Sequence, residues 1–95
     1  MIQIRAKTKL GWLHEKGHGT RVNKRKALDM YQEAAEKGEP EAQYRLASFH
    51  LKEPEYLENP DPHLAKELLE KSAIGGCPEG MRELGQIYER GGVFT

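Results

Sequence analysis

Three histidines, His14, His18 and His50, are the residues of this 95-residue sequence best suited to binding a metal ion. His14 and His50 lie 36 residues apart at equivalent positions of two similar segments, so we expect them in adjacent layers of helices. Such layers lie about 10 Å apart, whereas both imidazoles would have to come within about 2.1 Å of one zinc ion. We therefore predict no metal site and expect His14 and His50 to pack against neighbouring helices.

Cys77 is the single cysteine, which excludes an internal disulfide framework. It precedes Pro78 at an expected helix N-terminus, a position that can activate a thiol, but the sequence places no base beside it. The chain also lacks a Ser/His/Asp order, a phosphate-binding loop and a paired-cysteine motif. We predict no catalytic residue and no cofactor.

Trp12 is the single tryptophan, and it lies off the apolar stripe of its helix. Its counterparts in the later segments are Ser48 and Gln86, so small neighbours leave the indole room to meet a partner. Exposed aromatic residues among cations are typical of interface hot spots, with truncation costing about 2 kcal/mol or more. The alternative is that the ring folds over the N-terminal end of its own helix.

The element that positions these residues is a repeated segment. KALDMYQEAAEKG (26–38) returns 38 residues later as LAKELLEKSAIGG (64–76), and six of the 25 positions in 26–50 are identical at this offset. Five of the six identities fall on small, apolar or turn-forming residues. Similarity at a period of 20–50 residues indicates a solenoid, here a stack of helix pairs.

Apolar residues at a helical period predict five helices. Asn23, Pro40, Asp61 with Pro62, and Pro78 open four of them, while Gly17 and Gly19, Gly38, Gly75–Gly76 and Gly91–Gly92 close helices. Residues 53–62, which contain three prolines, form a loop. The stripes expected to be buried are Ile2, Ala6, Leu10, Leu13 and His14; Ala27, Met30, Tyr31, Ala34 and Ala35; Ala42, Leu46, Phe49 and His50; Ala65, Leu68, Leu69, Ser72 and Ala73; and Met81, Leu84, Ile87 and Tyr88.

The charge of the chain restricts its partners. The formal net charge is zero, so we expect no nucleic-acid binding. Residues 1–38 carry +5 (nine basic, four acidic) and residues 39–95 carry −5 (six basic, eleven acidic). This asymmetry could steer an acidic partner to the N-terminal end or favour head-to-tail contacts; the alternative is that the two halves simply have differently charged solvated faces. Without a run of 18 apolar residues or a signal peptide, we expect a cytoplasmic protein that does not bind membranes.

The pattern Leu-Gly-x-x-His-x-x-Gly (10–17), Lys-Ala (26–27) and Tyr-x-x-Ala-Ala-x-x-Gly (31–38) resembles the Sel-one-like repeat, a relative of the tetratricopeptide repeat. The segment 84–93 is similar to the end of that family's first helix, helix A. The resemblance implies an all-α fold, an α-solenoid of antiparallel helix pairs in a right-handed superhelix. It also implies one domain of about two and a half units, roughly 1–38, 39–76 and a partial 77–95.

The resemblance implies a non-catalytic scaffold or adaptor that binds a protein or peptide through a concave surface built by the helices A. Carried over in register, the partner-binding positions are Arg5, Thr8, Trp12, Lys16, Tyr44, Ser48, Leu51, Arg82 and Gln86. Further positions on the same surface are Glu15, Glu41, Lys52, Glu79, Glu89 and Arg90. Two alternatives are a structural segment of a longer solenoid and a cell-wall or β-lactam hydrolase; relatives linked to the latter carry a disulfide in each repeat, and this chain has one cysteine.

The chain departs from the family pattern at its ends. Ile2, Ile4, Val93 and Phe94 are apolar, although terminal solenoid repeats normally carry a polar outer face. We expect either a fragment of a longer array or self-association through the apolar ends.

Overall fold

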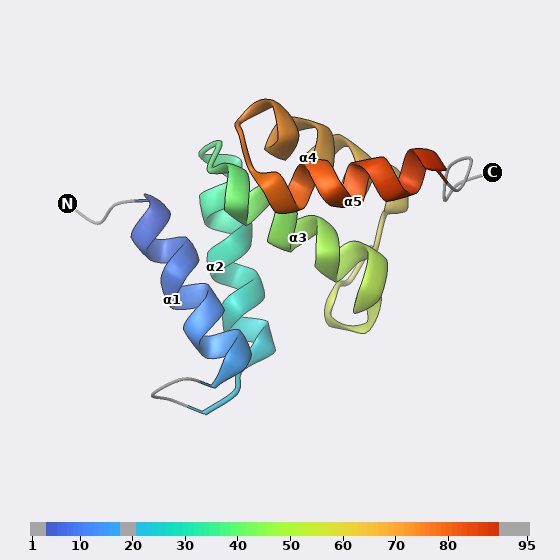
Figure 1. Ribbon diagram of the computed structural model, residues 1–95. Helices are drawn as coiled ribbons and strands as arrows, with labels where there is room; N and C mark the ends of the chain where they lie inside the picture. The colour runs from blue at the N-terminus through green and yellow to red at the C-terminus, as the bar shows by residue number, and fades with distance from the viewer. Residues whose placement is uncertain (1–3, 18–20, 90–95) are drawn as a thin grey trace.

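The computed structural model describes residues 4–17 and 21–89, and all regular structure in these ranges is helical. Within these two ranges five α-helices follow one another, with one 3₁₀ turn (η1) before the fourth (Figure 1). They are α1 (Ile4–Lys16), α2 (Lys24–Glu36), α3 (Pro40–Lys52), η1 (Pro54–Tyr56), α4 (Pro62–Ile74) and α5 (Pro78–Glu89). The all-α, repeat-built fold expected from the sequence is confirmed.

The starts of three helices are fixed by side chains that accept hydrogen bonds from otherwise unpaired backbone N–H groups. The Asn23 amide oxygen accepts from the N–H of Lys26 at 3.1 Å. The Asp61 carboxylate accepts from the N–H groups of His63 and Leu64 at 2.9 and 3.2 Å. Both caps were predicted. The cap of α3 was not predicted: the Glu39 carboxylate accepts a hydrogen bond from the N–H of Ala42 at 2.8 Å.

The ends of α2 and α4 are the same structure made twice. Gly38 and Gly76 have φ values of 88° and 93°, a left-handed conformation that glycine adopts without strain. The next residue donates its N–H back across the turn, from Glu39 to the carbonyl of Ala34 and from Cys77 to that of Ser72, at 3.1 and 3.0 Å. These are Schellman closures, and each turns the chain directly into the next helix.

Small residues lie where the helices cross. Ala27, Ala42, Ala47 and Ala65 are fully buried, which allows the helix axes to approach closely. At the α1–α2 crossing the small residue is Gly11, where an added Cβ would lie 2.8 Å from the Tyr31 ring. The predicted stripes of α2, α3 and α4 are buried apart from Met30 and Ala73, which are half-buried.

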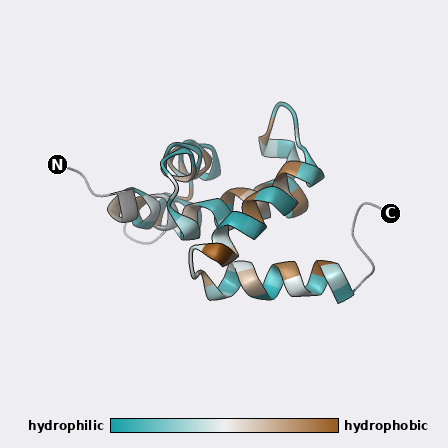
Figure 2. Cartoon of the chain, turned by 90° about the horizontal axis from the view of Figure 1, so that it is seen from above, coloured by the Kyte–Doolittle hydropathy of each residue, from teal (hydrophilic) through white to brown (hydrophobic). Residues whose placement is uncertain are grey.

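The first and last helices differ from α3 in how they are covered. Helix α3 packs against α2, α4 and α5, whereas α1 packs mainly on α2 (Figure 1). Seen from above, α5 lies along one edge of the molecule with the other helices to one side (Figure 2). Both outer helices therefore keep one face without a described neighbour.

This arrangement makes four burial predictions wrong. Ala6 and Leu10 on α1 are exposed, and so are Met81 and Tyr88 on α5. Leu10 is 42% exposed, whereas its equivalent Leu46 is 7% exposed between α2 and α4. The same apolar stripe is buried in α3, which has neighbouring helices on both sides, but not in α1. The apolar end residues Ile2, Val93 and Phe94 lie outside the described residues, as does the side chain of Ile4.

Candidate functional site

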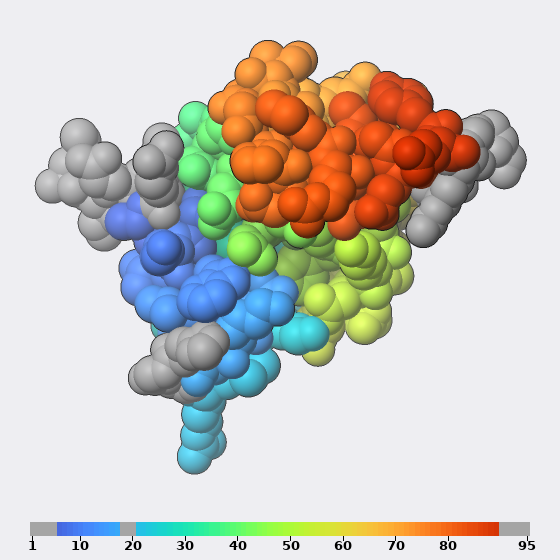
Figure 3. Space-filling model, viewed as in Figure 1, coloured from blue at the N-terminus to red at the C-terminus, as the bar shows by residue number. Residues whose placement is uncertain are grey.

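A small cavity lies on the face built by α1, α3 and α5. Figure 3 looks onto this face, where α1 (blue), α3 (green) and α5 (orange to red) all reach the surface. The cavity lies between the C-terminal halves of α1 and α3 and has a volume of about 230 Å³. Its lining residues are Glu15, Lys16, Tyr44, Arg45, Ser48, Phe49, Lys52 and Glu53.

The Glu15 carboxylate connects the two repeats at this cavity. It accepts a hydrogen bond from the Tyr31 hydroxyl at 2.8 Å and lies 4.0 Å from the Arg45 guanidinium. Arg45 also lies 3.6 Å from Glu41, four residues earlier on α3, and over the Tyr44 ring. With 14% of its side chain exposed, Glu15 joins α1, α2 and α3 through one carboxylate.

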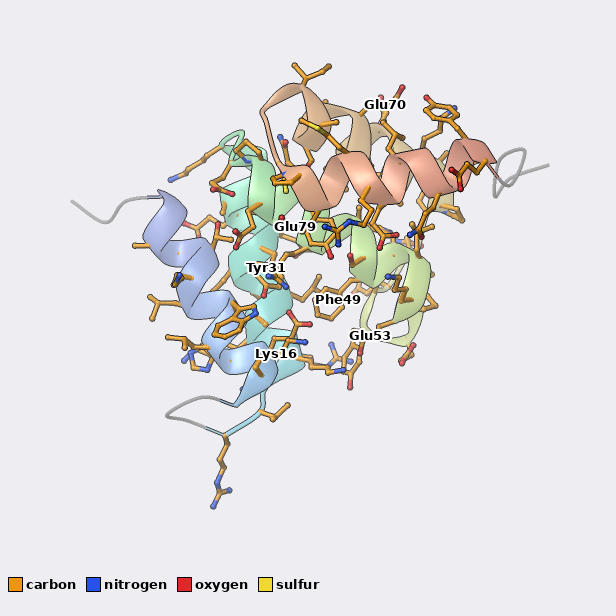
Figure 4. All side chains as sticks on the ribbon, viewed as in Figure 1. Lys16, Tyr31, Phe49, Glu53, Glu70 and Glu79 are labelled. Atoms are coloured by element: carbon orange, nitrogen blue, oxygen red, sulfur yellow. The ribbon has the colours of Figure 1, made fainter. Side chains whose placement is uncertain are left out.

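Tyr31, which donates the hydrogen bond to this carboxylate, is part of the buried core. Its ring is completely buried, and its centre lies 6.1 Å from that of the Phe49 ring at an interplanar angle of 50°; Figure 4 labels both side chains near the middle of the molecule. Burial, followed by the hydrogen bond to Glu15, raises the pKa of Tyr31 well above its usual value. The hydroxyl therefore stays protonated and acts as a fixed hydrogen-bond donor, not as a base or nucleophile.

One end of the cavity is held by an ion pair between Lys24 and Glu53. This hydrogen bond raises the pKa of Lys24. Lys24 also lies 5.9 Å from the centre of the Tyr56 ring, whose edge packs on Phe49. The ion pair thereby attaches the segment that follows α3 to the start of α2. The rings of Tyr56 and Phe49 extend the hydrophobic core to the edge of the cavity.

The cations at the rim are the most accessible charges of the cavity. Lys16 lies 3.9 Å from Glu15 with 49% of its side chain exposed. Lys52 bonds to Glu83 of α5 at 3.1 Å with 60% of its side chain exposed. The carboxylates Glu15 and Glu53 are more buried than these lysines, so an approaching molecule meets positive charge first.

Three of the predicted partner-binding residues, Lys16, Tyr44 and Ser48, line this cavity together. Trp12 is partly exposed on α1, and Arg82 and Gln86 are exposed on α5, but none of these three lines it. Leu51 is half-buried and packs against the core. The side chain of Arg5 lies outside the described residues.

The prediction for Thr8 is wrong, because this residue is 1% exposed and cannot meet a partner in this state. Each helical residue advances about 100° around the axis, so Thr8 and Gly11 share the face of α1 that packs on α2. The predicted stripe through Leu10 is rotated from that face by nearly half a turn. The sequence also gave no role to Arg45, whose spacing from Glu41 on one helix face was an available signal.

Two of the residues considered for chemistry, His50 and Cys77, are buried. His50 is buried, as predicted, and its Nδ1 accepts a hydrogen bond from the N–H of Asp61 at 2.9 Å. Cys77 is buried, and its Sγ contacts the Glu79 carboxylate at 4.0 Å, whereas reactive thiolates lie beside cations. In the described ranges, no group of three or more His, Cys, Asp or Glu residues could hold a metal ion. No helix among them is long and apolar enough to span a membrane.

A larger groove lies between α2 and α4, and sequence reasoning missed it. Its volume is about 730 Å³, and residues of the segment between α3 and α4 form one wall. Leu46 and His50 of α3 line this groove, whereas Tyr44 and Ser48 line the smaller cavity. Residues two apart on a helix point about 200° apart, so the two hollows lie on opposite sides of α3.

Comparison with known proteins agrees with this repeat architecture. A family model described as Sel1 repeat matches residues 4–39, 40–77 and 78–95. The crystal structure of a Sel1 repeat protein from Oxalobacter formigenes is similar, with 30% identity and a TM-score of 0.74 over 88% of this chain. So is c5321, a protective antigen present in uropathogenic Escherichia coli strains and displaying an SLR fold, with 32% identity and a TM-score of 0.81 over 95% of this chain.

The chain spans only part of both solved proteins. It covers 62% of the Oxalobacter formigenes protein and 19% of c5321. No curated protein matches the sequence.

Proposed function

Because this chain belongs to the Sel1 repeat family, whose members are in general protein-interaction scaffolds, we propose that it is a non-catalytic scaffold that binds a protein or peptide partner. The binding surface is the face of α1 and α3 around the cavity between them. The observation that carries the proposal is that Lys16, Tyr44 and Ser48, from two successive repeats, line one cavity.

The partner segment presents an acidic side chain to this surface. Lys16 and Lys52 are the accessible charges at the rim, and the excess of basic residues in 1–38 attracts acidic segments over longer distances. At about 230 Å³ the cavity is below the usual size of small-molecule sites, about 300–1,000 Å³, and it suits a single side chain. Tyr44, which is half-buried beside it, supplies an aromatic contact of the kind enriched at interfaces.

The test is affinity capture from a bacterial lysate with two charge-reversal variants of the same helix. Lys16→Glu reverses a charge at the cavity, and Lys9→Glu reverses an exposed charge elsewhere on α1. We expect quantitative mass spectrometry to show a partner captured by the wild type and by K9E and lost with K16E. A partner retained equally by both variants would show that it binds elsewhere.

A second candidate is a structural segment of a longer helical stack or of a self-assembled one. It is favoured by the exposed outer faces of α1 and α5, where Leu10 and Tyr88 are 42% and 55% exposed. Their equivalents in α3, Leu46 and His50, are each 7% exposed because α2 and α4 cover them. In this case, other repeats or a second copy of the chain would cover these faces.

A further inference from the structure

The groove between α2 and α4 has the properties of a binding site. Its floor is formed by Leu28, Leu46 and Leu68, each from a different helix, and Leu57 stands in the wall. Its volume of about 730 Å³ lies within the range of ligand sites, about 300–1,000 Å³. The groove runs between two helices that occupy equivalent places in successive repeats, and it is partly open to solvent.

One hydrogen-bond donor at the surface of this groove has no partner among the described residues. Because Nδ1 of His50 accepts from the N–H of Asp61, the neutral ring carries its proton on Nε2. His50 is 7% exposed and its exposed edge contributes to the groove lining. Within the described part of the chain, Nε2–H has no acceptor. Such a donor among leucines favours a ligand that brings an oxygen acceptor.

The wall formed by residues 56–59 is held in place before any ligand arrives. Pro54 and Pro60 restrict the backbone of the segment, the Tyr56 ring packs edge-on against Phe49 at 6.0 Å, and His50 holds the N–H of Asp61. A wall that is already ordered lowers the entropic cost of binding.

The charges around the groove are unpaired and predominantly acidic. The lining contains three carboxylates and two cations, a balance of −1: Asp29, Glu36, Glu58, Arg25 and Lys71. None of the five forms an ion pair with another described residue. A basic group on the ligand complements this rim.

We propose that this groove binds a peptide segment in which a leucine-like side chain is followed by a basic residue. The apolar side chain lies among the three floor leucines, a main-chain carbonyl accepts from His50 Nε2–H, and the basic residue pairs with the acidic rim. The open, charged edges favour a peptide over a compact small molecule. The site lies across α3 from the cavity between α1 and α3 and does not depend on the function proposed for that cavity.

The test is an NMR titration of the isotope-labelled full chain with four probes. N-acetyl-leucyl-lysinamide carries every proposed feature. N-acetyl-alanyl-lysinamide lacks the apolar side chain, N-acetyl-leucyl-glutamate α-amide reverses the charge, and 4-methylpentan-1-ol has the apolar group without an amide.

We expect N-acetyl-leucyl-lysinamide to shift the methyl signals of Leu28, Leu46 and Leu68 and the Nε2 signal of His50. The dissociation constant should be on the order of 1 mM, as for a fragment of this size. The alanyl and glutamyl probes should bind several-fold more weakly. Equal binding of either one, shifts confined to the cavity between α1 and α3, or the same shifts with 4-methylpentan-1-ol would overturn the proposal.

A variant of His50 tests the role of its Nε2–H donor while keeping an acceptor for the N–H of Asp61. In His50→Asn, the side-chain oxygen replaces Nδ1 as acceptor for the N–H of Asp61, whereas the ring donor is lost. Binding of N-acetyl-leucyl-lysinamide should weaken about 2- to 10-fold, the range for one hydrogen bond. Unchanged binding by a folded H50N chain would remove His50 from the site, and the probe series on the wild type remains decisive if this variant does not fold.

Discussion

At the scale of single residues, the crossing of α4 and α5 shows how two substitutions compensate. Ser72 and Gly80 occupy the positions that Ala34 and Ala42 hold one repeat earlier. A Cβ added at Gly80 would lie 2.2 Å from the Ser72 hydroxyl oxygen, which is buried and has no hydrogen-bond partner in the described structure. The larger residue on α4 is thus accommodated by the smaller residue on α5.

We therefore predict that Gly80→Ala destabilises the chain by about 1–3 kcal/mol, the usual cost of overpacking. Ser72→Ala removes an unpaired buried hydroxyl and should be neutral or stabilising. The double variant S72A/G80A restores the pair found at Ala34 and Ala42, so it should recover most of the loss. Urea unfolding of the four chains measures this coupling, and strictly additive effects would refute it.

The Tyr31 hydroxyl is a second residue with a measurable role. Tyr31→Phe keeps the ring packed on Phe49 but removes the hydrogen bond to the Glu15 carboxylate. We expect a loss of about 1–2 kcal/mol, because hydrogen bonds to charged groups are among the stronger ones. Tyr44→Phe is the matched control, since the hydroxyl of Tyr44 has no hydrogen bond to a described residue. Equal effects of the two substitutions on thermal unfolding would contradict a role for this hydrogen bond.

At the scale of elements, the boundaries of the helices could be predicted from short stretches of sequence. Asn23 and Asp61 accept from the first backbone N–H groups of their helices, and Gly38 and Gly76 end two helices in the same left-handed turn. These signals act within a few residues, so they do not depend on the rest of the fold. The apolar stripes of α2, α3 and α4 were equally readable because these helices have neighbours on both sides.

The wrong burial predictions and the unpredicted groove have a different cause. An apolar stripe shows which residues prefer burial, but it does not show which faces of a helix are covered. The orientation of α1, and with it the burial of Thr8, follows mainly from its packing against α2. The groove between α2 and α4 depends on where residues 53–61 settle in three dimensions, which their prolines and polarity do not specify.

The attachment of this loop makes the stability of the chain depend on pH. Burial lowers the pKa of His50, with the nearby Asp61 carboxylate opposing this effect, and the neutral ring is the form that accepts from the Asp61 N–H. The unfolded chain takes up the proton first, near pH 6.5. The contribution of His50 to the free energy of unfolding is therefore fully present above that pH. It is lost as the pH decreases from about 6.5 to the lower pKa of the folded state.

The loss amounts to ~1.4 kcal/mol for each unit by which the folded pKa is lowered. Chemical unfolding between pH 7 and pH 5 measures it. His50→Asn keeps an acceptor without a titrating ring, so its stability should change less over this range. A wild type whose stability is flat from pH 7 to pH 5 would contradict the role given to His50.

At the scale of the whole molecule, the exposed face of α5 provides a test of assembly. Met81 and Tyr88 lie on this face, and an added Cβ at Gly85 between them would meet no atom within 4 Å. Close approach at a glycine, flanked by two exposed apolar side chains, favours contact with another helix. We propose that this face mediates self-association.

Sedimentation velocity should then show an average mass that rises with concentration for the wild type and stays monomeric for Tyr88→Glu. Because Tyr88 is 55% exposed, the substitution should leave the fold intact. A wild type that remains monomeric up to its solubility limit would rule out this contact between copies.

The central claim is that a partner binds at the face of α1 and α3 between successive repeats. The most direct measurement is site-specific photo-crosslinking in the bacterial cell, with p-benzoylphenylalanine placed either at Ser48, which lines the cavity, or at Glu67, an exposed position of α4 that lines neither hollow. We expect a discrete crosslinked protein from position 48 and none from position 67. Crosslinks from position 67 alone would contradict it.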